Sequence, residues 1–295
     1  MNNEMYEIMK DKRGFIAALD QSGGSSSKTL KAYGIPETAY NTEEKMFDLI
    51  HEMRKRVFTS KSFTNEHIIG AILFEKTMLS KVNGEFTADY LWNEKKIVSF
   101  LKVDKGLAEQ NNGVKLMKPI LELETELKEA VEKHVFGTKM RSVIYEPNVE
   151  GIKAIVAQQF EFAKIICDAG LVPIIEPEVD INAPEKEKCE EILKTEIIEK
   201  LKTWNKDDKI MFKFTIPTVA NHYLDLYDYE CVVRIVALSG GYDIDKAVEL
   251  LAKNNIMIAS FSRALLQDLN VHQTQDEFDQ KLHDVIVKIY DASIS

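Results

Sequence analysis

The stretch that decides the fold is residues 152–175, IKAIVAQQFEFAKIICDAGLVPII. Its first part places apolar side chains three or four residues apart, from Ile152 to Cys167, which predicts an amphipathic helix. Gly170 then provides a stop signal for that helix, and an apolar run of strand length begins directly at Leu171. A helix that gives way to a buried strand within a few residues is typical of α/β proteins.

The same alternation recurs along the rest of the chain. Helical spacing of apolar residues also marks residues 46–57 and 278–289, and the second segment follows the capping-box pair Thr274 and Glu277. Eight short apolar runs predict strands that are buried on both faces, as in a parallel sheet. They are residues 15–19, 68–74, 97–103, 138–144, 171–175, 210–215, 232–238 and 256–261. Eight strands that alternate with helices favour a closed (β/α)8 TIM barrel, an α/β fold, over an open sheet.

Length and composition agree with one such barrel. The chain has 295 residues and no low-complexity linker, so we expect a single TIM-barrel catalytic domain over residues 1–295. Its 38 Lys and Arg residues against 48 Asp and Glu residues give a net charge of −10, which excludes a general surface for nucleic acid or anionic membrane. The three cysteines are scattered, and residues 1–10 lack the apolar segment of a signal peptide. We therefore expect a cytoplasmic protein.

Charged residues lie where the predicted strands end, although those strands are otherwise apolar. Asp20 follows the first run, Glu176 and Glu178 follow the fifth, and Lys213 lies inside the sixth. In a TIM barrel the active site is built at these ends of the strands. A lysine amine that is removed from water or placed near other cations becomes a nucleophile. The alternative is that each of these side chains is an ordinary ion-paired surface group.

Two further segments have the composition of phosphate-binding loops. Residues 239–241, SGG, follow the seventh run, where barrels commonly bind phosphate through backbone N–H groups. Residues 20–25, DQSGGS, follow the first run; either segment could instead be a plain turn. The six histidines show no metal-ligand spacing and no glycine-rich nucleotide loop follows a strand, so we expect no metal and no cofactor.

Together these motifs resemble the class I fructose-bisphosphate aldolases, and most of all their shorter bacterial members. The likeness rests on segments in the family's order: LDQS at 19–22, LKVDKG at 101–106, KMR at 139–141, IEPE at 175–178, Lys213, LSGG at 238–241 and SFSRAL at 260–265. The resemblance implies a carbon–carbon lyase (an aldehyde-lyase) of glycolysis and gluconeogenesis. Such an enzyme cleaves fructose 1,6-bisphosphate reversibly to dihydroxyacetone phosphate and glyceraldehyde 3-phosphate, through a Schiff base and without a metal.

The resemblance also implies a role for each site residue. Lys213 would form the Schiff base, Glu176 would be the general acid and base, and Asp20 would orient the substrate hydroxyls. Lys139 would be a second active-site lysine whose charge favours the neutral amine of Lys213, and Glu178 would pair with Lys139 and hold it in place. The substrate phosphates would be bound by Ser239, Gly240, Gly241 and Arg263 at C1 and by Ser22, Ser25, Lys28 and Lys102 at C6, with Arg141 as a further substrate-binding residue.

The sequence departs from the family at several positions, among them residues 261–263, which lack the Tyr-Gly insertion of the animal enzymes, and it leaves two rival functions open. Gln21 stands where many members have Glu, and Tyr290 lies in the final predicted helix, where we expect a structural role rather than proton transfer. One rival is another Schiff-base barrel, such as a transaldolase or a deoxyribose-phosphate aldolase. The other is a barrel that binds phosphates or a partner protein without catalysis. Two phosphate-binding segments favour a bisphosphate substrate, and the sequence does not indicate an oligomeric state.

Overall fold

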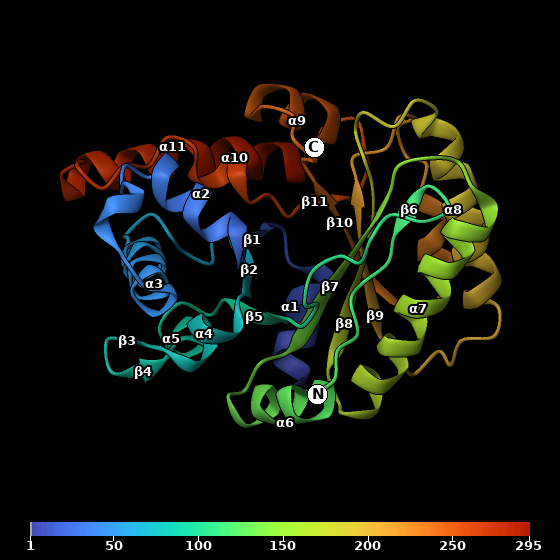
Figure 1. The fold of residues 1–295 in the computed structure, drawn as a ribbon, viewed down its shortest axis with the longest axis horizontal. Helices are drawn as coiled ribbons and strands as arrows, with labels where there is room; N and C mark the ends of the chain where they lie inside the picture. Colours follow the sequence, from blue (N-terminus) through green and yellow to red (C-terminus); the bar gives the residue numbers. More distant parts are fainter. Residues whose placement is uncertain (1) are drawn as a thin grey trace.

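The chain folds into a ring of eight parallel strands, and the computed structural model describes residues 2–295 of it. In order around the ring they are β1 (Phe15–Leu19), β2 (Ile68–Leu73), β5 (Val98–Lys102), β7 (Gly137–Ile144), β8 (Val172–Val179), β9 (Ile210–Thr215), β10 (Val232–Leu238) and β11 (Ile258–Ala259). The backbone N–H of Ala18 donates to the carbonyl oxygen of Phe261 at 3.2 Å, which links the last strand segment to the first. The predicted (β/α)8 barrel is confirmed (Figure 1).

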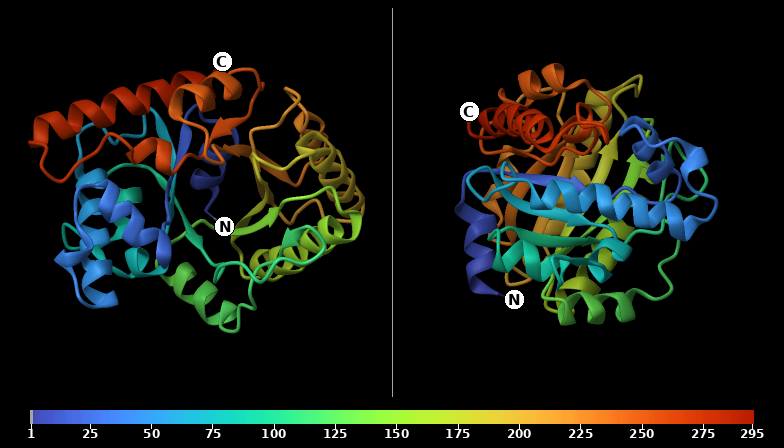
Figure 2. Two further views of the ribbon diagram at one scale, coloured as in Figure 1. Left: turned by 45° about the horizontal axis from the view of Figure 1, so that its top comes forward. Right: turned by 90° about the vertical axis from the view of Figure 1, so that its left-hand side faces the viewer.

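Helices surround this ring. The longest are α3 (Glu43–Thr59), α7 (Val149–Asp168), α8 (Lys186–Leu201) and α11 (Gln275–Ser293). The shorter ones are α1 (Asn3–Asp11), α2 (Gly24–Ala32), α4 (Glu75–Leu79), α5 (Thr87–Asn93), α6 (Leu123–Glu132), α9 (Ile244–Leu251) and α10 (Arg263–Leu266), with 3-10 turns at Glu37–Ala39 and Leu224–Asp228. Helices α3, α7 and α11 confirm the three predicted helices, and α11 begins with the capping box. Figure 2 shows the helices around the strands in two further orientations.

Some element boundaries differ from the prediction. Strand β8 runs on to Val179 instead of stopping at Ile175, because it pairs with β7 residue by residue up to Ile144 opposite Val179. Strand β11 is limited to Ile258–Ala259. The sequence did not predict β6 (Val114–Lys115) or the hairpin of β3 (Lys81–Val82) and β4 (Glu85–Phe86). Strands of two residues are too short to show an alternating pattern.

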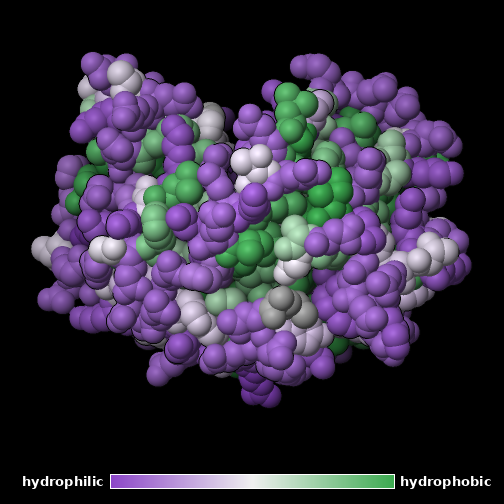
Figure 3. All heavy atoms as spheres, turned by 90° about the horizontal axis from the view of Figure 1, so that it is seen from below, coloured by the Kyte–Doolittle hydropathy of each residue, from purple (hydrophilic) through white to green (hydrophobic). Residues whose placement is uncertain are grey.

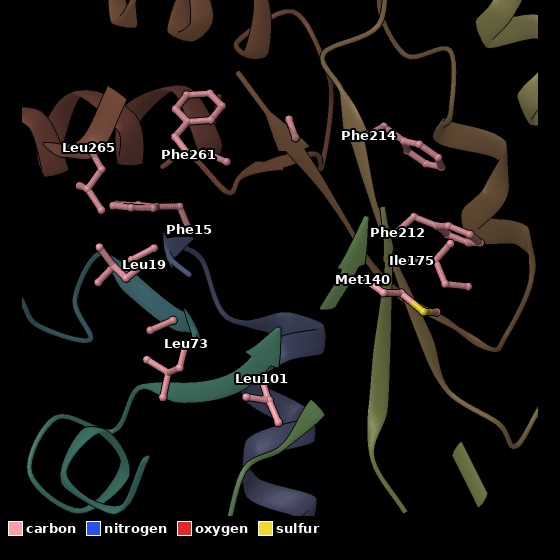
Figure 4. Close-up of a cluster of buried hydrophobic side chains, with 14 of the residues drawn as sticks. Phe15, Leu19, Leu73, Leu101, Met140, Ile175, Phe212, Phe214, Phe261 and Leu265 are labelled. Atoms are coloured by element: carbon pink, nitrogen blue, oxygen red, sulfur yellow. The ribbon is translucent and has the colours of Figure 1, made fainter. Parts of the chain in front are cut away.

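Alternate residues of each strand contribute to two separate layers of core. In β1, Phe15 and Leu19 belong to the layer between strands and helices, whereas Ile16 and Ala18 belong to a cluster that fills the barrel interior. Figure 4 shows outer-layer side chains from both sides of the ring, among them Phe15, Leu19 and Phe212. This alternation follows from the two-residue period of a strand. It also decides which residues at the strand ends face the mouth of the barrel.

Helix α1 closes the amino-terminal end of the barrel. Its Met5 and Met9 pack into the interior cluster with residues from the strands. Arg234 on β10 donates to the carbonyl oxygens of Met9 at 2.7 Å, Lys10 at 2.6 Å and Lys12 at 3.2 Å, all at the end of this helix. Since this end is filled, a substrate has access to the interior only from the opposite end of the strands.

The outer surface is mostly hydrophilic. On the face drawn in Figure 3, hydrophilic residues predominate, hydrophobic residues gather near the centre, and a notch separates two lobes at the upper edge. Over residues 2–295, none of the helices has the length and apolar character needed to cross a bilayer.

Candidate active site

A cavity of about 610 Å³ opens at the carboxyl ends of the strands. It is lined by thirteen of the fourteen residues that the sequence singled out: Asp20, Ser22, Ser25, Lys28, Lys102, Lys139, Arg141, Glu176, Glu178, Lys213, Ser239, Gly240 and Arg263. The fourteenth, Gly241, lies beside the cavity, because a Cβ atom at this position would be 3.4 Å from Nη2 of Arg263. The structure therefore brings the whole predicted set together.

The alternation of the strands explains why these side chains face inward. Met211 of β9 packs in the interior cluster, and Lys213 follows it on the same face two residues later. Ile174 of β8 is likewise an interior residue, and Glu176 and Glu178 continue its face toward the mouth. Each polar side chain thus takes the next inward position above an apolar one. The change from apolar to charged residues along one strand face marks the floor of the cavity.

Four buried charged residues form the centre of the site. Nζ of Lys139 lies 2.7 Å from Oδ2 of Asp20 and 3.0 Å from Oε2 of Glu176. The other oxygen of Glu176, Oε1, lies 3.1 Å from Nζ of Lys213. All four residues are buried, with relative exposures from 3% to 9%. Glu176 therefore bridges the two lysines, and Lys139 bridges the two carboxylates.

The surroundings keep the Asp20–Lys139 pair ionised. Burial alone would raise the pKa of Asp20, but the charges of Lys139, Lys213 and Lys102 outweigh it and hold that pKa well below its usual range. Burial would lower the pKa of Lys139, but Asp20, Glu176 and Asp104 outweigh it and raise that pKa. At neutral pH the site therefore contains a permanent carboxylate and a permanent ammonium group beside Glu176.

The prediction that Glu178 pairs with Lys139 is wrong. Oε2 of Glu178 lies 2.5 Å from Nε of Arg141, while the ion-pair partners of Lys139 are Asp20, Glu176 and, at 3.8 Å, Asp104. The reason is the height of each residue in the barrel. Two residues along a strand correspond to about 6.5 Å. Glu178 on β8 is one inward step above Glu176, and Arg141 on β7 is one inward step above Lys139.

The two predicted phosphate-binding segments lie in the loops at the mouth. In the loop after β1, the backbone N–H of Ser22 donates to Oγ of Ser25 at 2.9 Å, which fixes the turn into α2. In the loop after β10, Gly240 and Gly241 have φ angles of 62° and 120°, a conformation that favours glycine. Lys28 and Arg263 are exposed at the rim, so their cationic groups are accessible to an anionic ligand.

Several residues that support the site were missed by the sequence analysis. Asp104, buried within the LKVDKG segment, lies 2.9 Å from Nζ of Lys102. Gln159 of α7 accepts from the backbone N–H of Glu176 at 2.9 Å and donates to Oγ of Ser142 at 3.0 Å. A glutamine in the apolar stripe of an amphipathic helix is a signal that could have found it. Buried Arg54 of α3 is a third such residue.

Tyr290 does not line the cavity. Its ring packs edge to face on His67, with 4.7 Å between the ring centroids, and this packing agrees with the structural role expected for it. Within the part of the chain that the structure describes, no group of three or more His, Cys, Asp or Glu residues is arranged to hold a metal ion.

Comparisons with known proteins identify the family of the chain. The family model described as fructose-bisphosphate aldolase class-I matches residues 1–219. A protein named fructose-bisphosphate aldolase class 1 from Clostridium acetobutylicum is 57% identical over 292 residues, which cover 99% of each chain.

Solved structures show the same fold. Fructose-bisphosphate aldolase from Plasmodium falciparum matches with a TM-score of 0.75 and 20% identity, over 99% of this chain and 94% of that one. A protein from Corynebacterium glutamicum matches with a TM-score of 0.51 and 11% identity, over 99% of this chain and 92% of that one. The family model and the Clostridium relative, which span most or all of the sequence, decide the assignment: the chain belongs to the class I fructose-bisphosphate aldolase family.

Proposed function

We propose that this protein cleaves fructose 1,6-bisphosphate reversibly to dihydroxyacetone phosphate and glyceraldehyde 3-phosphate, through a Schiff base on Lys213. Membership of the family supports the reaction and its substrates. The observation that carries the assignment of residues is the 3.1 Å distance between Nζ of Lys213 and Oε1 of Glu176 in a buried site. This distance permits direct proton transfer between the amine and the carboxylate.

The first stage joins the ketose to the enzyme. Glu176 takes a proton from the Lys213 ammonium group, and the neutral amine attacks the C2 carbonyl to form a carbinolamine. Glu176 then returns a proton to the carbinolamine hydroxyl, which leaves as water. The product is an iminium ion on Lys213, and Glu176 is again a carboxylate.

The second stage breaks the carbon–carbon bond. Glu176 takes the proton of the C4 hydroxyl, the C3–C4 bond breaks, and its electron pair moves into the iminium group to give an enamine. Glyceraldehyde 3-phosphate leaves. Protonation of the enamine at C3 and addition of water then release dihydroxyacetone phosphate and restore Lys213. Because the iminium withdraws the electrons, this proposal needs no metal and no other cofactor.

Asp20 and Lys139 would orient the Glu176 carboxylate for proton transfer with Lys213. Lys139 contacts Oε2 of Glu176 and leaves Oε1 directed at Lys213. Asp20 holds Lys139 from the other side at 2.7 Å and lines the cavity, where its carboxylate can accept from substrate hydroxyls. Glu178 would act one step nearer the mouth, by fixing Arg141 for substrate binding.

The two phosphate groups would be bound by two separate sets of residues at the mouth. Ser239, Gly240, Gly241 and Arg263 are proposed to bind the C1 phosphate, and Ser22, Ser25, Lys28 and Lys102 the C6 phosphate. Two separate sets of donors favour a bisphosphate over the monophosphates of other Schiff-base barrels. We also propose that residues 1–295 form a single catalytic domain that acts in the cytoplasm. The three cysteines are free thiols, as is usual in a reducing compartment.

The decisive experiment is borohydride reduction in the presence of dihydroxyacetone phosphate, followed by mass mapping of the modified lysine. We expect one covalent adduct, on Lys213, and none in Lys213→Met. Lys209→Met is the matched control, because the Lys209 amine contacts backbone carbonyls at the surface and this variant should still be trapped. An adduct on another lysine, or no adduct on folded protein, would overturn the proposed mechanism. Cleavage of ketose monophosphates as fast as the bisphosphate would favour the rival Schiff-base enzymes.

A further inference from the structure

Gln21 connects two loops that are neighbours at the mouth of the barrel, because β11 lies beside β1 in the ring. It follows Asp20 in the loop between β1 and α2 and is half-buried. Its Nε2 donates to Oγ of Ser262 at 2.7 Å, in the loop after β11. The two residues are 241 positions apart in the chain, so this contact joins the beginning of the barrel to its end.

Arg54 holds Gln21 from behind. From α3, its Nη2 donates to the backbone carbonyl oxygen of Gln21 at 2.6 Å and to Oε1 of Gln21 at 3.1 Å. Its Nη1 donates to Oγ1 of Thr77 at 2.7 Å. These bonds fix both the backbone and the side chain of Gln21. They leave the amide nitrogen of Gln21 free to point at Ser262.

Arg54 is an unusual residue for a purely structural purpose. It is 0% exposed, and among the described residues 2–295 it forms no ion pair with a carboxylate. Burial lowers the pKa of Arg54 to about 10, so the guanidinium group remains charged at neutral pH. A buried charge without a carboxylate partner is expensive, and an apolar side chain would fill the same space at lower cost. The free-energy cost of burying Arg54 is explained if the position of the loop that it holds matters for substrate binding.

Each of the two connected loops contributes to one of the two proposed phosphate sites. Ser22, Ser25 and Lys28 lie just after Gln21, and Arg263 lies just after Ser262. A bisphosphate that is bound at both ends gains both sets of contacts most favourably when the loops are already held at the matching distance. A monophosphate uses one loop and does not depend on that distance.

We propose that Arg54 and Gln21 are positioning residues that fix the spacing between the loop after β1 and Arg263 after β11, and so select doubly over singly phosphorylated ketoses. The inference rests on the proposed function, because that function assigns the loops to the two phosphates. Arg54 acts through Gln21, and Gln21 acts through Ser262.

The test compares KM and kcat for fructose 1,6-bisphosphate and fructose 1-phosphate in Gln21→Met. A net hydrogen bond contributes about 0.5 to 1.5 kcal/mol, so we expect KM for the bisphosphate to rise about three- to tenfold. KM for the monophosphate and both kcat values should stay within about twofold, since the catalytic centre is unchanged. Ser27→Ala is the matched control, because Ser27 lies on α2, directly after the Gln21 loop, but contacts Glu37 and Tyr40 instead of the loop after β11.

A double-mutant cycle isolates the bridge itself. Ser262→Ala removes the acceptor of the Gln21 amide, so we expect it to raise KM for the bisphosphate as Gln21→Met does. The double variant should be no worse than either single variant. Both positions are half-buried, so these variants are expected to fold. Arg54→Lys, which keeps the charge but loses the fork that grips Gln21, should give the same shift if it folds.

The possible results separate this inference from the proposed function. Equal effects on the two substrates, no effect of Gln21→Met, a lowered kcat with unchanged KM, or additive effects in the cycle would each overturn the positioning role. In all of these cases the wild-type enzyme still cleaves the bisphosphate. If the wild-type protein cleaves neither ketose, it is the proposed function that fails.

Discussion

At the scale of single residues, the site depends on charges that stabilise one another. Lys139, Asp20, Glu176 and Lys213 are all buried, and each would be costly alone. In this chain every member contacts at least one partner of opposite charge within 3.1 Å. Such clusters add little to stability compared with a well-packed apolar core. Their presence at the strand ends is therefore explained by chemistry rather than by folding.

Lys213→Met should separate these two contributions. Glu176 keeps Lys139 as a partner in this variant, so we expect the free energy of unfolding to change by less than about 1 kcal/mol. Cleavage should fall by more than about 10⁴-fold, equivalent to about 5.4 kcal/mol of transition-state stabilisation, because no nucleophile remains. Denaturant unfolding and a coupled cleavage assay measure the two quantities. A variant that loses both stability and activity in proportion would point to a structural lysine instead.

Asp20→Asn should have an effect on stability that depends on pH. The pKa of Asp20 is lowered in the folded state from its ordinary value of 3.8, so its contribution to stability is present above about pH 3.8 and is lost as pH falls toward the folded value. The pKa of Lys139 is raised above 10.5, so its contribution is complete below pH 10.5 and is lost only above it. We therefore expect the variant to be less stable by about 1 to 3 kcal/mol between pH 5 and 9.

Unfolding curves taken from pH 7 down to pH 3 test whether the stability difference between wild type and Asp20→Asn becomes smaller as the pH falls. The difference between wild type and Asp20→Asn should shrink below pH 3.8, because Asp20 then binds a proton in the unfolded wild-type chain but not yet in the folded one. If the difference in stability grew as the pH fell, the Asp20 carboxylate would not be stabilised by Lys139 in the folded protein.

The residue scale also shows where sequence reasoning stops. The set of mouth residues could be predicted, because most of them lie in or directly after an apolar run and belong to a family motif. The partner of Glu178 could not, because pairing across neighbouring strands depends on the stagger of β7 against β8. Arg54 was hidden for a related reason: it follows Met53 in an amphipathic helix, where a charged residue reads as solvent-exposed.

At the scale of elements, each barrel strand combines two functions along its length. Its lower inward residues fill the interior and its upper inward residues enter the cavity, as Met211 and Lys213 do on β9. The eight strands were predictable because each is a short continuous apolar run, and the three helices because their apolar residues recur every three or four positions. The limits of β8 were not, since Glu176 and Pro177 read as a loop but pair with Arg141 and Ser142.

Helix α1 offers a prediction about the opposite end of the barrel. Arg234→Met removes three hydrogen bonds to the carbonyl oxygens of Met9, Lys10 and Lys12. We expect a loss of about 2 to 4 kcal/mol in the free energy of unfolding, since charged donors to buried carbonyls are strong. Amide hydrogen exchange in α1 should rise first. The kcat should remain close to that of wild type, because the helix lies at the closed end.

Lys10→Met is the control for this experiment. The Lys10 side chain is exposed on the same helix and its backbone carbonyl is retained, so neither stability nor exchange should change. If Arg234→Met lost activity while amide hydrogen exchange in α1 stayed unchanged, the role of α1 in stabilising the closed end of the barrel would be contradicted.

At the scale of the whole molecule, the net charge of −10 conflicts with a substrate that is itself an anion. The conflict is resolved by location. Six cationic residues line the cavity, namely Lys28, Lys102, Lys139, Arg141, Lys213 and Arg263, against the three carboxylates of Asp20, Glu176 and Glu178. The mouth therefore carries a local positive excess on an acidic protein. Composition alone predicts repulsion of the bisphosphate, whereas the structure predicts attraction.

The salt dependence of kcat/KM decides between the local and the global charge. The Debye length falls from about 30 Å at 0.01 M salt to about 8 Å at 0.15 M. If the mouth attracts the bisphosphate, added salt screens the attraction and kcat/KM should fall, by about threefold or more over this range. If the overall charge dominated, added salt would screen repulsion and kcat/KM would rise. Steady-state rates at constant pH, with an inert salt, give the sign directly.

Two variants with the same change in net charge locate the effect. Lys28→Gln removes a cation from the rim of the cavity. Lys202→Gln removes a cation at the end of α8, which precedes β9 and therefore lies at the closed end of the barrel, away from the cavity. We expect Lys28→Gln to flatten the salt dependence and Lys202→Gln to leave it unchanged. If both variants reduced the salt dependence of kcat/KM equally, the bisphosphate would be responding to the net charge of the whole molecule. The field of a single lysine falls off within a Debye length, whereas every lysine contributes equally to the net charge.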